Sequence, residues 1–210
     1  MRYGAQHKAA TRARILEAAG RTLRVGGLGG VSVEKVMAAA GLTVGGFYAH
    51  FRSKEALIGE ALGSALEDSA RRWTAGLEEA RGFDFVRGLV RRYLNRAHRD
   101  GPESGCPLAP ALSELARASA ATHVAVSGDV EALLARLTPQ MVGADEFSRR
   151  QNAVAVLALC FGGLSLARAV AGTALSDEVL RASRAFAEAA VRPPGEGRGG
   201  GGPTPPKIHS

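Results

Sequence analysis

The chain has 210 residues, of which 46% are hydrophobic and 22% charged, a balance typical of a globular protein with a packed core. Its two cysteines, Cys106 and Cys160, are too few for a disulfide framework, which favours a reducing, cytoplasmic compartment. Residues 1–24 are basic and lack an apolar segment, so no signal peptide is expected. The apolar run 153–167 is too short to cross a bilayer. Secreted and membrane proteins are therefore disfavoured.

The net charge of +7 is concentrated at one end of the chain. Residues 1–54 contain nine basic and two acidic residues, whereas the remainder contains 18 of each. A neutral body with a basic end favours a polyanion as partner. A solvated basic face without a partner is the alternative. The basic residues of this segment are Arg2, Lys8, Arg12, Arg14, Arg21, Arg24, Lys35, Arg52 and Lys54.

The first fifty residues have the pattern of three helices. An amphipathic stripe over residues 15–23 predicts a first helix that ends in the glycine-rich segment 26–30. Ser32 is placed to cap a second helix, which Gly41 breaks after two turns. Thr43 is placed to cap a third helix, which runs to His50 or Phe51. Two short helices joined by a glycine turn are typical of a helix-turn-helix.

The remaining sequence also predicts helices. Ser53 is placed to cap a longer fourth helix, and no segment shows the alternation of a strand. An all-α fold follows, with a disordered tail, 193–210, rich in glycine and proline. The further helices are expected at residues 84–99, 107–121, 123–137, 146–172 and 176–191.

The segment 42–57 is the most specific part of the sequence. Phe47 and Phe51 are four residues apart and are expected in the core, whereas Tyr48 does not share their helix face. Residues from about 8 to 68 resemble the DNA-binding domain of the TetR family of bacterial transcriptional regulators. The resemblance is carried by Arg14-Ile-Leu-x-Ala-Ala19, Gly26 or Gly27, Val36, Ala39-Ala-Gly-Leu-Thr43, Gly46-Phe-Tyr48, Phe51 and Ser53-Lys-Glu-Ala-Leu57.

The resemblance implies a positioning helix at 34–40 and a recognition helix at 43–49, the latter in the major groove. The implied phosphate contacts come from Thr43, Tyr48, His50 and Lys54, with Ser32 capping the positioning helix near the backbone. The implied contacts to base edges come from Val44, Gly45 and Phe47.

The recognition segment carries no arginine or lysine for bidentate contact with guanine. Three sources of base specificity remain open. They are contact of Val44 with a thymine methyl group, close backbone approach at Gly45, and arginines of an N-terminal arm in the minor groove.

The resemblance further implies that residues 69–192 bind an effector and dimerise. The protein is then a homodimeric repressor, released from a palindromic DNA operator by a small-molecule or electrophile effector. The apolar helices 146–172 and 176–191 are expected to form the dimer interface. A small, mostly apolar or aromatic effector is expected in a pocket lined by Trp73, Phe85, Leu89, Tyr93, Cys106, Leu112 and Leu115.

Cys106 precedes Pro107, which fits the first position of a helix, so Cys106 is expected at the N-cap, where the helix dipole favours a thiolate. It is therefore either an electrophile or oxidant sensor, as in some TetR-family members, or a structural thiol. No lysine of the helical body is available to bond to an oxidised Cys106. The five histidines are scattered, so no metal site, cofactor or enzymatic activity is expected, although a nucleophilic pair of Cys106 with His98 stays open.

Overall fold

The computed structural model describes residues 2–192, and these residues form helices without strands, which confirms the all-α prediction. The predicted tail, residues 193–210, lies outside the described residues. The α-helices are α1 (Arg2–Gly26), α2 (Val33–Ala39), α3 (Lys54–Thr74), α4 (Gly82–Tyr93), α5 (Arg96–Asp100), α6 (Leu108–Leu115), α7 (Ala120–Leu137), α8 (Glu146–Ala169) and α9 (Ala174–Ala190). Short 3₁₀ helices are η1 (Val44–Ala49), η2 (Pro102–Ser104) and η3 (Thr138–Gln140).

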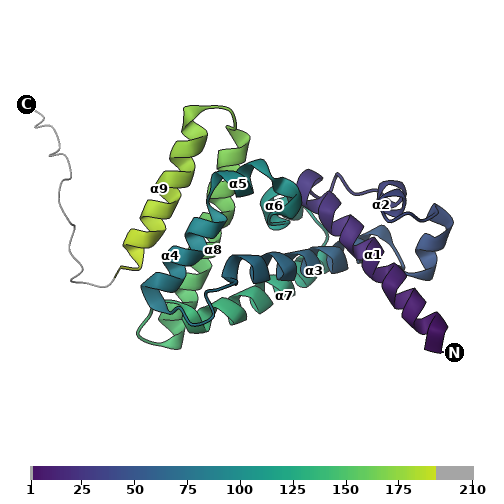
Figure 1. Cartoon of the computed structure of the whole chain (residues 1–210), viewed down its shortest axis with the longest axis horizontal. Helices are drawn as coiled ribbons and strands as arrows, with labels where there is room; N and C mark the ends of the chain where they lie inside the picture. Colours follow the sequence, from purple (N-terminus) through teal and green to yellow (C-terminus); the bar gives the residue numbers. More distant parts are fainter. Residues whose placement is uncertain (1, 193–210) are drawn as a thin grey trace, which may run out of the picture.

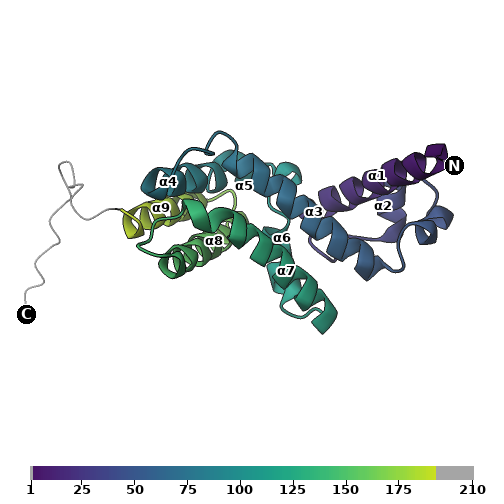
Figure 2. The same cartoon turned by 90° about the horizontal axis from the view of Figure 1, so that it is seen from below.

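The described chain is elongated, with the N-terminal unit at one end and the antiparallel pair α8 and α9 at the other (Figure 1). The N-terminal unit consists of α1, α2 and η1, together with the first turns of α3. Helix α3 continues without interruption from this unit into the helical body (Figure 2). The predicted boundary between residues 68 and 69 falls inside α3, so both parts of the chain share one helix.

The caps of the N-terminal unit follow the sequence with one exception. The Ser32 hydroxyl accepts a hydrogen bond from the Lys35 amide, and the Ser53 hydroxyl accepts one from the Ala56 amide, as predicted. Thr43 precedes η1 but makes no capping hydrogen bond with its side chain. The predicted capping role of Thr43 is therefore wrong, because η1 is a 3₁₀ helix of six residues rather than an α-helix.

Gly41 forms the turn between α2 and η1. Its φ of +67° lies in the left-handed region, which disfavours residues with a side chain. The Gly41 amide donates to the Ala38 carbonyl, and the Leu42 amide donates to the Met37 carbonyl, each at 2.9 Å. These two bonds are those of a Schellman motif, which ends a helix by satisfying its last carbonyls.

Two of the predicted helices of the body are shorter or divided. Residues 84–99 form α4 and α5, because the Asn95 side chain accepts a hydrogen bond from the His98 amide and starts a new helix. The helix predicted at 107–121 ends at Leu115. The Ser119 side chain then caps α7, which begins three residues before its predicted start.

Helix α8 is longer than the apolar run 153–167 that it contains. By length and composition it could cross a membrane, with a mean hydropathy of 1.6 over its 18-residue window. However, it packs against α4, α6, α7 and α9, and 44% of that window is buried. These contacts are typical of a core helix. Part of its apolar surface stays uncovered, since Val154 and Leu166 are exposed.

Replacing Gly41 by Ala should destabilise the fold by about 1–2 kcal/mol, since alanine in the left-handed region carries that cost. The added Cβ would also lie 3.1 Å from Nη2 of Arg14. Urea unfolding followed by circular dichroism measures the change. Gly45→Ala is the matched control, because Gly45 has no positive φ and no atom within 4 Å of an added Cβ. Equal stability of the two variants would contradict the assigned role of Gly41.

Candidate nucleic-acid interface

The segment around η1 has several exposed side chains next to the buried side chain of Phe47. Val44 is 45% exposed and Tyr48 is 76% exposed. Thr43 and Gly45 are exposed beside them, and open space surrounds the position of a Cβ at Gly45. Four of the predicted contact residues therefore lie on one accessible segment.

Phe47 does not belong to this surface. It is fully buried, with its ring 5.8 Å from that of Phe51 and 5.1 Å from that of Tyr48, measured between centroids. The predicted core position of Phe47 and Phe51 is confirmed, and the implied contact of Phe47 with base edges is wrong. The Phe47 ring instead anchors η1, so that Val44, Gly45 and Tyr48 are held on a rigid support.

The other implied phosphate contacts lie at the edges of the exposed segment and are half-buried. Ser32 caps α2, His50 follows η1, and Lys54 is the first residue of α3. The Nδ1 atom of His50 is buried and has no hydrogen-bond partner among the described residues. His50 and Lys54 follow η1 directly in the chain, whereas Ser32 lies at the start of α2, which packs against η1.

The basic residues of the N-terminal segment are not all available to a partner. Arg12 pairs with Glu60 and stacks over the Phe51 ring at 4.6 Å. Arg21 pairs with Glu17 at 2.5 Å, and Arg14 donates to the Ala40 carbonyl. Side chains that stay exposed or half-buried, without such contacts, are those of Lys8, Lys35, Arg52 and Lys54.

The predicted N-terminal arm is helical where the structure describes it. Helix α1 begins at Arg2 and continues to Gly26. A helix of about 10 Å diameter does not enter a minor groove of about 6 Å width. An arm in the minor groove would therefore have to reach it with arginine side chains rather than with its backbone, and the three sources of base specificity stay predictions.

The end of α1 is joined to the helical body by charged groups. Arg24 is 7% exposed, and its guanidinium donates to the carbonyls of Gly105 (3.0 Å) and Ala65 (3.1 Å). The Glu114 carboxylate of α6 accepts hydrogen bonds from the amides of Leu28 and Gly29, each at 2.7 Å. The position of the exposed η1 segment is thereby fixed relative to the body.

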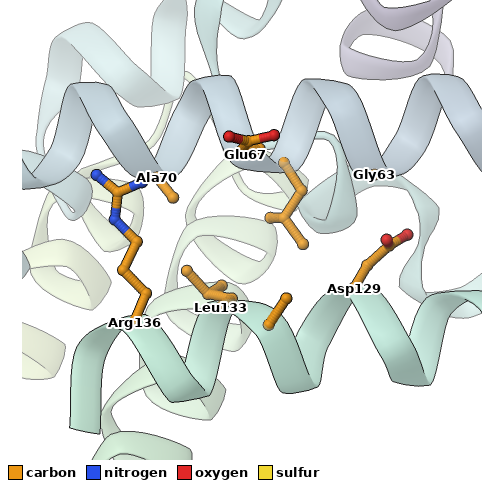
Figure 3. Close-up of a pocket in the computed structure, with 8 residues that line it drawn as sticks. Gly63, Glu67, Ala70, Asp129, Leu133 and Arg136 are labelled. Carbon is orange, nitrogen blue, oxygen red and sulfur yellow. The ribbon is translucent and has the colours of Figure 1, made fainter. Parts of the chain in front are cut away.

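The residues predicted to line an effector pocket form a packed cluster. The ring centroids of Trp73 and Tyr93 are 4.7 Å apart, and those of Tyr93 and Phe161 are 5.9 Å apart. Leu112 departs from the prediction because it is 39% exposed. Trp73, Phe85, Leu89, Tyr93, Cys106 and Leu115 are buried. A cavity of the body lies elsewhere, between α3 and α7 (Figure 3).

The environment of Cys106 differs from the prediction. Helix α6 starts at Leu108, one residue later than expected, although Pro107 already has helical angles (φ −73°, ψ −22°). Burial raises the pKa of the Cys106 thiol and outweighs the opposing effect of the first amides of α6. The predicted stabilisation of a thiolate is therefore wrong. Burial also raises the pKa of the Cys160 thiol.

His98 and Cys106 are adjacent but do not form a catalytic pair. The Cys106 amide donates to Nε2 of His98 at 3.0 Å, and Nδ1 of His98 lies 2.7 Å from the Tyr93 carbonyl oxygen. Burial lowers the pKa of His98 to about 4, so the ring is neutral at pH 7. Both ring nitrogens are used by the backbone, which leaves neither free to take a proton from the thiol.

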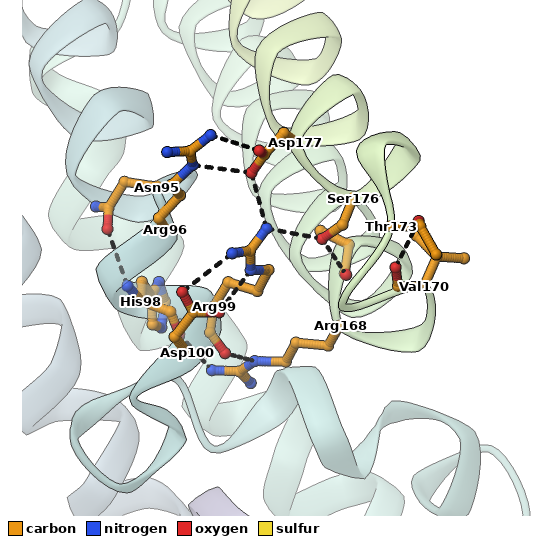
Figure 4. Close-up of polar contacts among 11 residues, drawn as sticks. Asn95, Arg96, His98, Arg99, Asp100, Arg168, Val170, Thr173, Ser176 and Asp177 are labelled. Atoms are coloured by element: carbon orange, nitrogen blue, oxygen red, sulfur yellow. Dashed lines mark hydrogen bonds and ion pairs between the residues drawn. The ribbon is translucent and has the colours of Figure 1, made fainter.

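Polar contacts tie α5 to α8 and α9 (Figure 4). Arg99 donates to the side chains of Ser176 and Asp177, each at 2.9 Å. Hydrogen bonds from Arg96 to Asp177 lower the pKa of this carboxyl to about 2. Arg168 donates to the carbonyls of His98 and Arg99. These contacts position the segment before Cys106.

The described residues, 2–192, contain no group of three potential metal ligands from His, Cys, Asp and Glu.

Comparison with known proteins identifies the exposed segment. Residues 15–61 match the model of the bacterial regulatory proteins of the TetR family, a range that contains most of α1, α2, η1 and the start of α3. The N-terminal unit therefore has the sequence of a TetR-family helix-turn-helix domain. In that family the helix-turn-helix binds DNA, and the exposed face of η1 lies within the matched range. No curated protein matches the sequence.

Solved structures share the whole fold. Reduced NemR from E. coli has a TM-score of 0.72 at 22% identity, with 89% of this chain and 99% of that chain covered. A TetR-family regulator from Cytophaga hutchinsonii has a TM-score of 0.70 at 22% identity, covering 88% and 96%. FadR from Bacillus subtilis in complex with stearoyl-CoA has a TM-score of 0.59 at 16% identity, covering 81% and 96%. The helical body therefore has the fold of TetR-family second domains.

Replacing Lys54 by Ala should weaken binding to all DNA sequences alike and reduce the slope of log affinity against log salt by about one unit, since one phosphate contact is lost. Fluorescence anisotropy over a salt series measures both quantities. Arg87→Ala is the control, because it removes one exposed positive charge from α4 in the body. A changed sequence preference with an unchanged slope would contradict the phosphate role.

Proposed function

We propose that the protein is a homodimeric transcriptional repressor that occupies a palindromic operator until a small molecule binds to its helical body. The carrying observation is the exposed segment of Val44, Gly45 and Tyr48, which is held on the buried Phe47 ring within a TetR-type helix-turn-helix. Residues 8–68 then form the DNA-binding domain, and residues 69–192 bind the effector and dimerise. We expect a cytoplasmic protein without catalytic activity.

The proposal of a homodimer is supported by uncovered apolar side chains on α8 and α9. An apolar cavity of about 280 Å³ opens between these helices, and Phe186 on its rim is 69% exposed. A monomer would leave this surface in contact with water, whereas a two-fold dimer would cover it. The exposed apolar residues of the two helices are Phe147, Val154, Leu166, Leu175 and Phe186.

The effector is proposed to bind without covalent bonds. The Cys106 side chain is fully buried and its pKa is raised, so the reactive thiolate is scarce at pH 7. One observation still favours a sensor: the nearby Tyr93 hydroxyl and Nη1 of Arg168 are buried without hydrogen-bond partners among the described residues. The Bacillus subtilis regulator FadR, which shares this fold, was solved in complex with stearoyl-CoA.

The wild-type protein should elute as a dimer in size-exclusion chromatography with light scattering. It should protect an imperfect palindrome in the DNA upstream of its own gene, with half-sites roughly 34–36 Å apart or a multiple of that distance. Phe186→Asp should yield a folded monomer with much weaker operator binding, since a buried charge opposes association. A wild-type monomer that protects a single asymmetric half-site would overturn the proposal.

Val124→Asp is the matched control for this experiment. Val124 is 74% exposed and lies near the start of α7, so it belongs to neither of the two helices proposed for the interface. The control variant should therefore remain dimeric and bind the operator as the wild type does.

Wild type and Cys106→Ser should respond alike when hypochlorite or an electrophile is added to the operator complex. The buried thiol is protected in the folded protein. Titration with an aromatic disulfide should detect neither cysteine under native conditions and both in denaturant. Operator release by the oxidant in wild type alone would instead establish Cys106 as a sensor.

A further inference from the structure

A cavity of about 200 Å³ between α3 and α7 has an apolar inner side (Figure 3). Leu66 and Leu133 are buried in it, whereas Glu67 and Ala132 are exposed, so the cavity opens to solvent. Its lining consists of Gly63, Leu66, Glu67 and Ala70 from α3, and Asp129, Ala132, Leu133 and Arg136 from α7. None of the residues that the sequence predicted for an effector pocket belongs to this lining.

Asp129 is the unpaired charge of this cavity. It is half-buried, and burial alone raises its pKa, because no hydrogen-bond or ion-pair partner is present among residues 2–192. The carboxylate points from α7 towards α3 (Figure 3). A Cβ at Gly63 would lie 2.6 Å from its Oδ1 atom, so the close approach depends on glycine at this position.

The other charged side chains of the cavity already have partners. Glu67 pairs with Arg71 at 2.5 Å. Arg136 lies at the opposite end from Asp129 and donates to the Thr74 hydroxyl at 3.2 Å (Figure 3). Asp129 is therefore the charged side chain of this lining that has no partner among the described residues.

A second cavity continues the groove on the other side of Asp129, also between α3 and α7. It has a volume of about 520 Å³, and its lining contains the carboxylates of Glu55, Glu60 and Asp129 but no basic residue. Glu60 pairs with Arg12. Asp129 belongs to the linings of both cavities, and its carboxylate favours a positively charged ligand in either of them.

We propose that the cavity between α3 and α7 binds a small organic cation, with an ammonium or amidinium group against Asp129 and an apolar body against Leu66 and Leu133. The volume corresponds to about seven water molecules, which limits the ligand to roughly ten non-hydrogen atoms. A cation supplies the charge-assisted hydrogen bond that Asp129 lacks.

The site is placed to act on the DNA-binding surface, a role that rests on the proposed function. Helix α3 begins beside η1 and packs against α1, and its central turns form one wall of the cavity. A ligand that prefers a different separation of α3 and α7 shifts the population of the conformation that fits the operator.

Isothermal titration at pH 7 with phenethylamine and its neutral analogue phenethyl alcohol tests the site. The wild type should bind the amine at least about tenfold more tightly than the alcohol, a difference of one charge-assisted interaction. Asp129→Asn should remove this preference. Glu131→Gln is the matched control, because it removes a carboxylate from the same helix outside the cavity, and it should bind the amine as the wild type does.

Asp129→Asn should be at least as stable to heat as the wild type, since it relieves a half-buried unpaired carboxylate. Ala132→Leu, which fills the cavity from an exposed position, should also weaken amine binding by about tenfold. Equal affinity for amine and alcohol, unchanged affinity in both cavity variants, or no binding of either probe would overturn the site.

Operator affinity, measured with and without saturating phenethylamine, separates the site from the proposed function. A protein that binds no operator but still prefers the amine through Asp129 would overturn the repressor and leave the cation site in place. Operator binding without any amine binding would overturn only the cation site.

Discussion

The attachment of α1 to the segment before α6 is the constraint on which the geometry of the molecule depends. Arg24 is a nearly buried cation whose partners are backbone carbonyls rather than a carboxylate, and burial accordingly lowers its pKa. Losing these carbonyls would leave a buried charge unpaired, which commonly costs about 3–5 kcal/mol. Glu114 complements the arrangement by accepting from two amides beyond the end of α1.

The Gly105 carbonyl accepts hydrogen bonds from both Arg24 and Ser69, so one carbonyl of the body contacts α1 and α3. The next amide, that of Cys106, donates to His98 in the packed cluster around Tyr93. A rearrangement in this cluster must therefore break these bonds or displace α1 and α3 together. These hydrogen bonds connect the cluster around Tyr93 with α1 and α3, the two helices of the N-terminal unit that extend to the body.

Features that depend on neighbouring residues were predictable from the sequence, and those that depend on distant packing were not. Ser32, Ser53 and Gly41 act within one turn of chain, so their roles followed from local rules. Arg24 was counted with the basic surface, although contacts with residues far along the chain bury it. The raised pKa of Cys106 has the same origin, because a cap position alone predicts the opposite shift.

The location of a ligand site could not be predicted from the sequence either, because it also depends on distant packing. Apolar residues such as Trp73 and Tyr93 satisfy the criteria for a pocket lining and for a core equally well, and here they pack against each other. The cavity at Asp129 is instead recognised by two features: a glycine at position 63, facing Asp129, and a carboxylate without a partner among the described residues. Both arise only when α3 and α7 are side by side. Since α3 follows η1 directly in the chain and also forms one wall of this cavity, the proposed ligand site and the exposed segment share one helix.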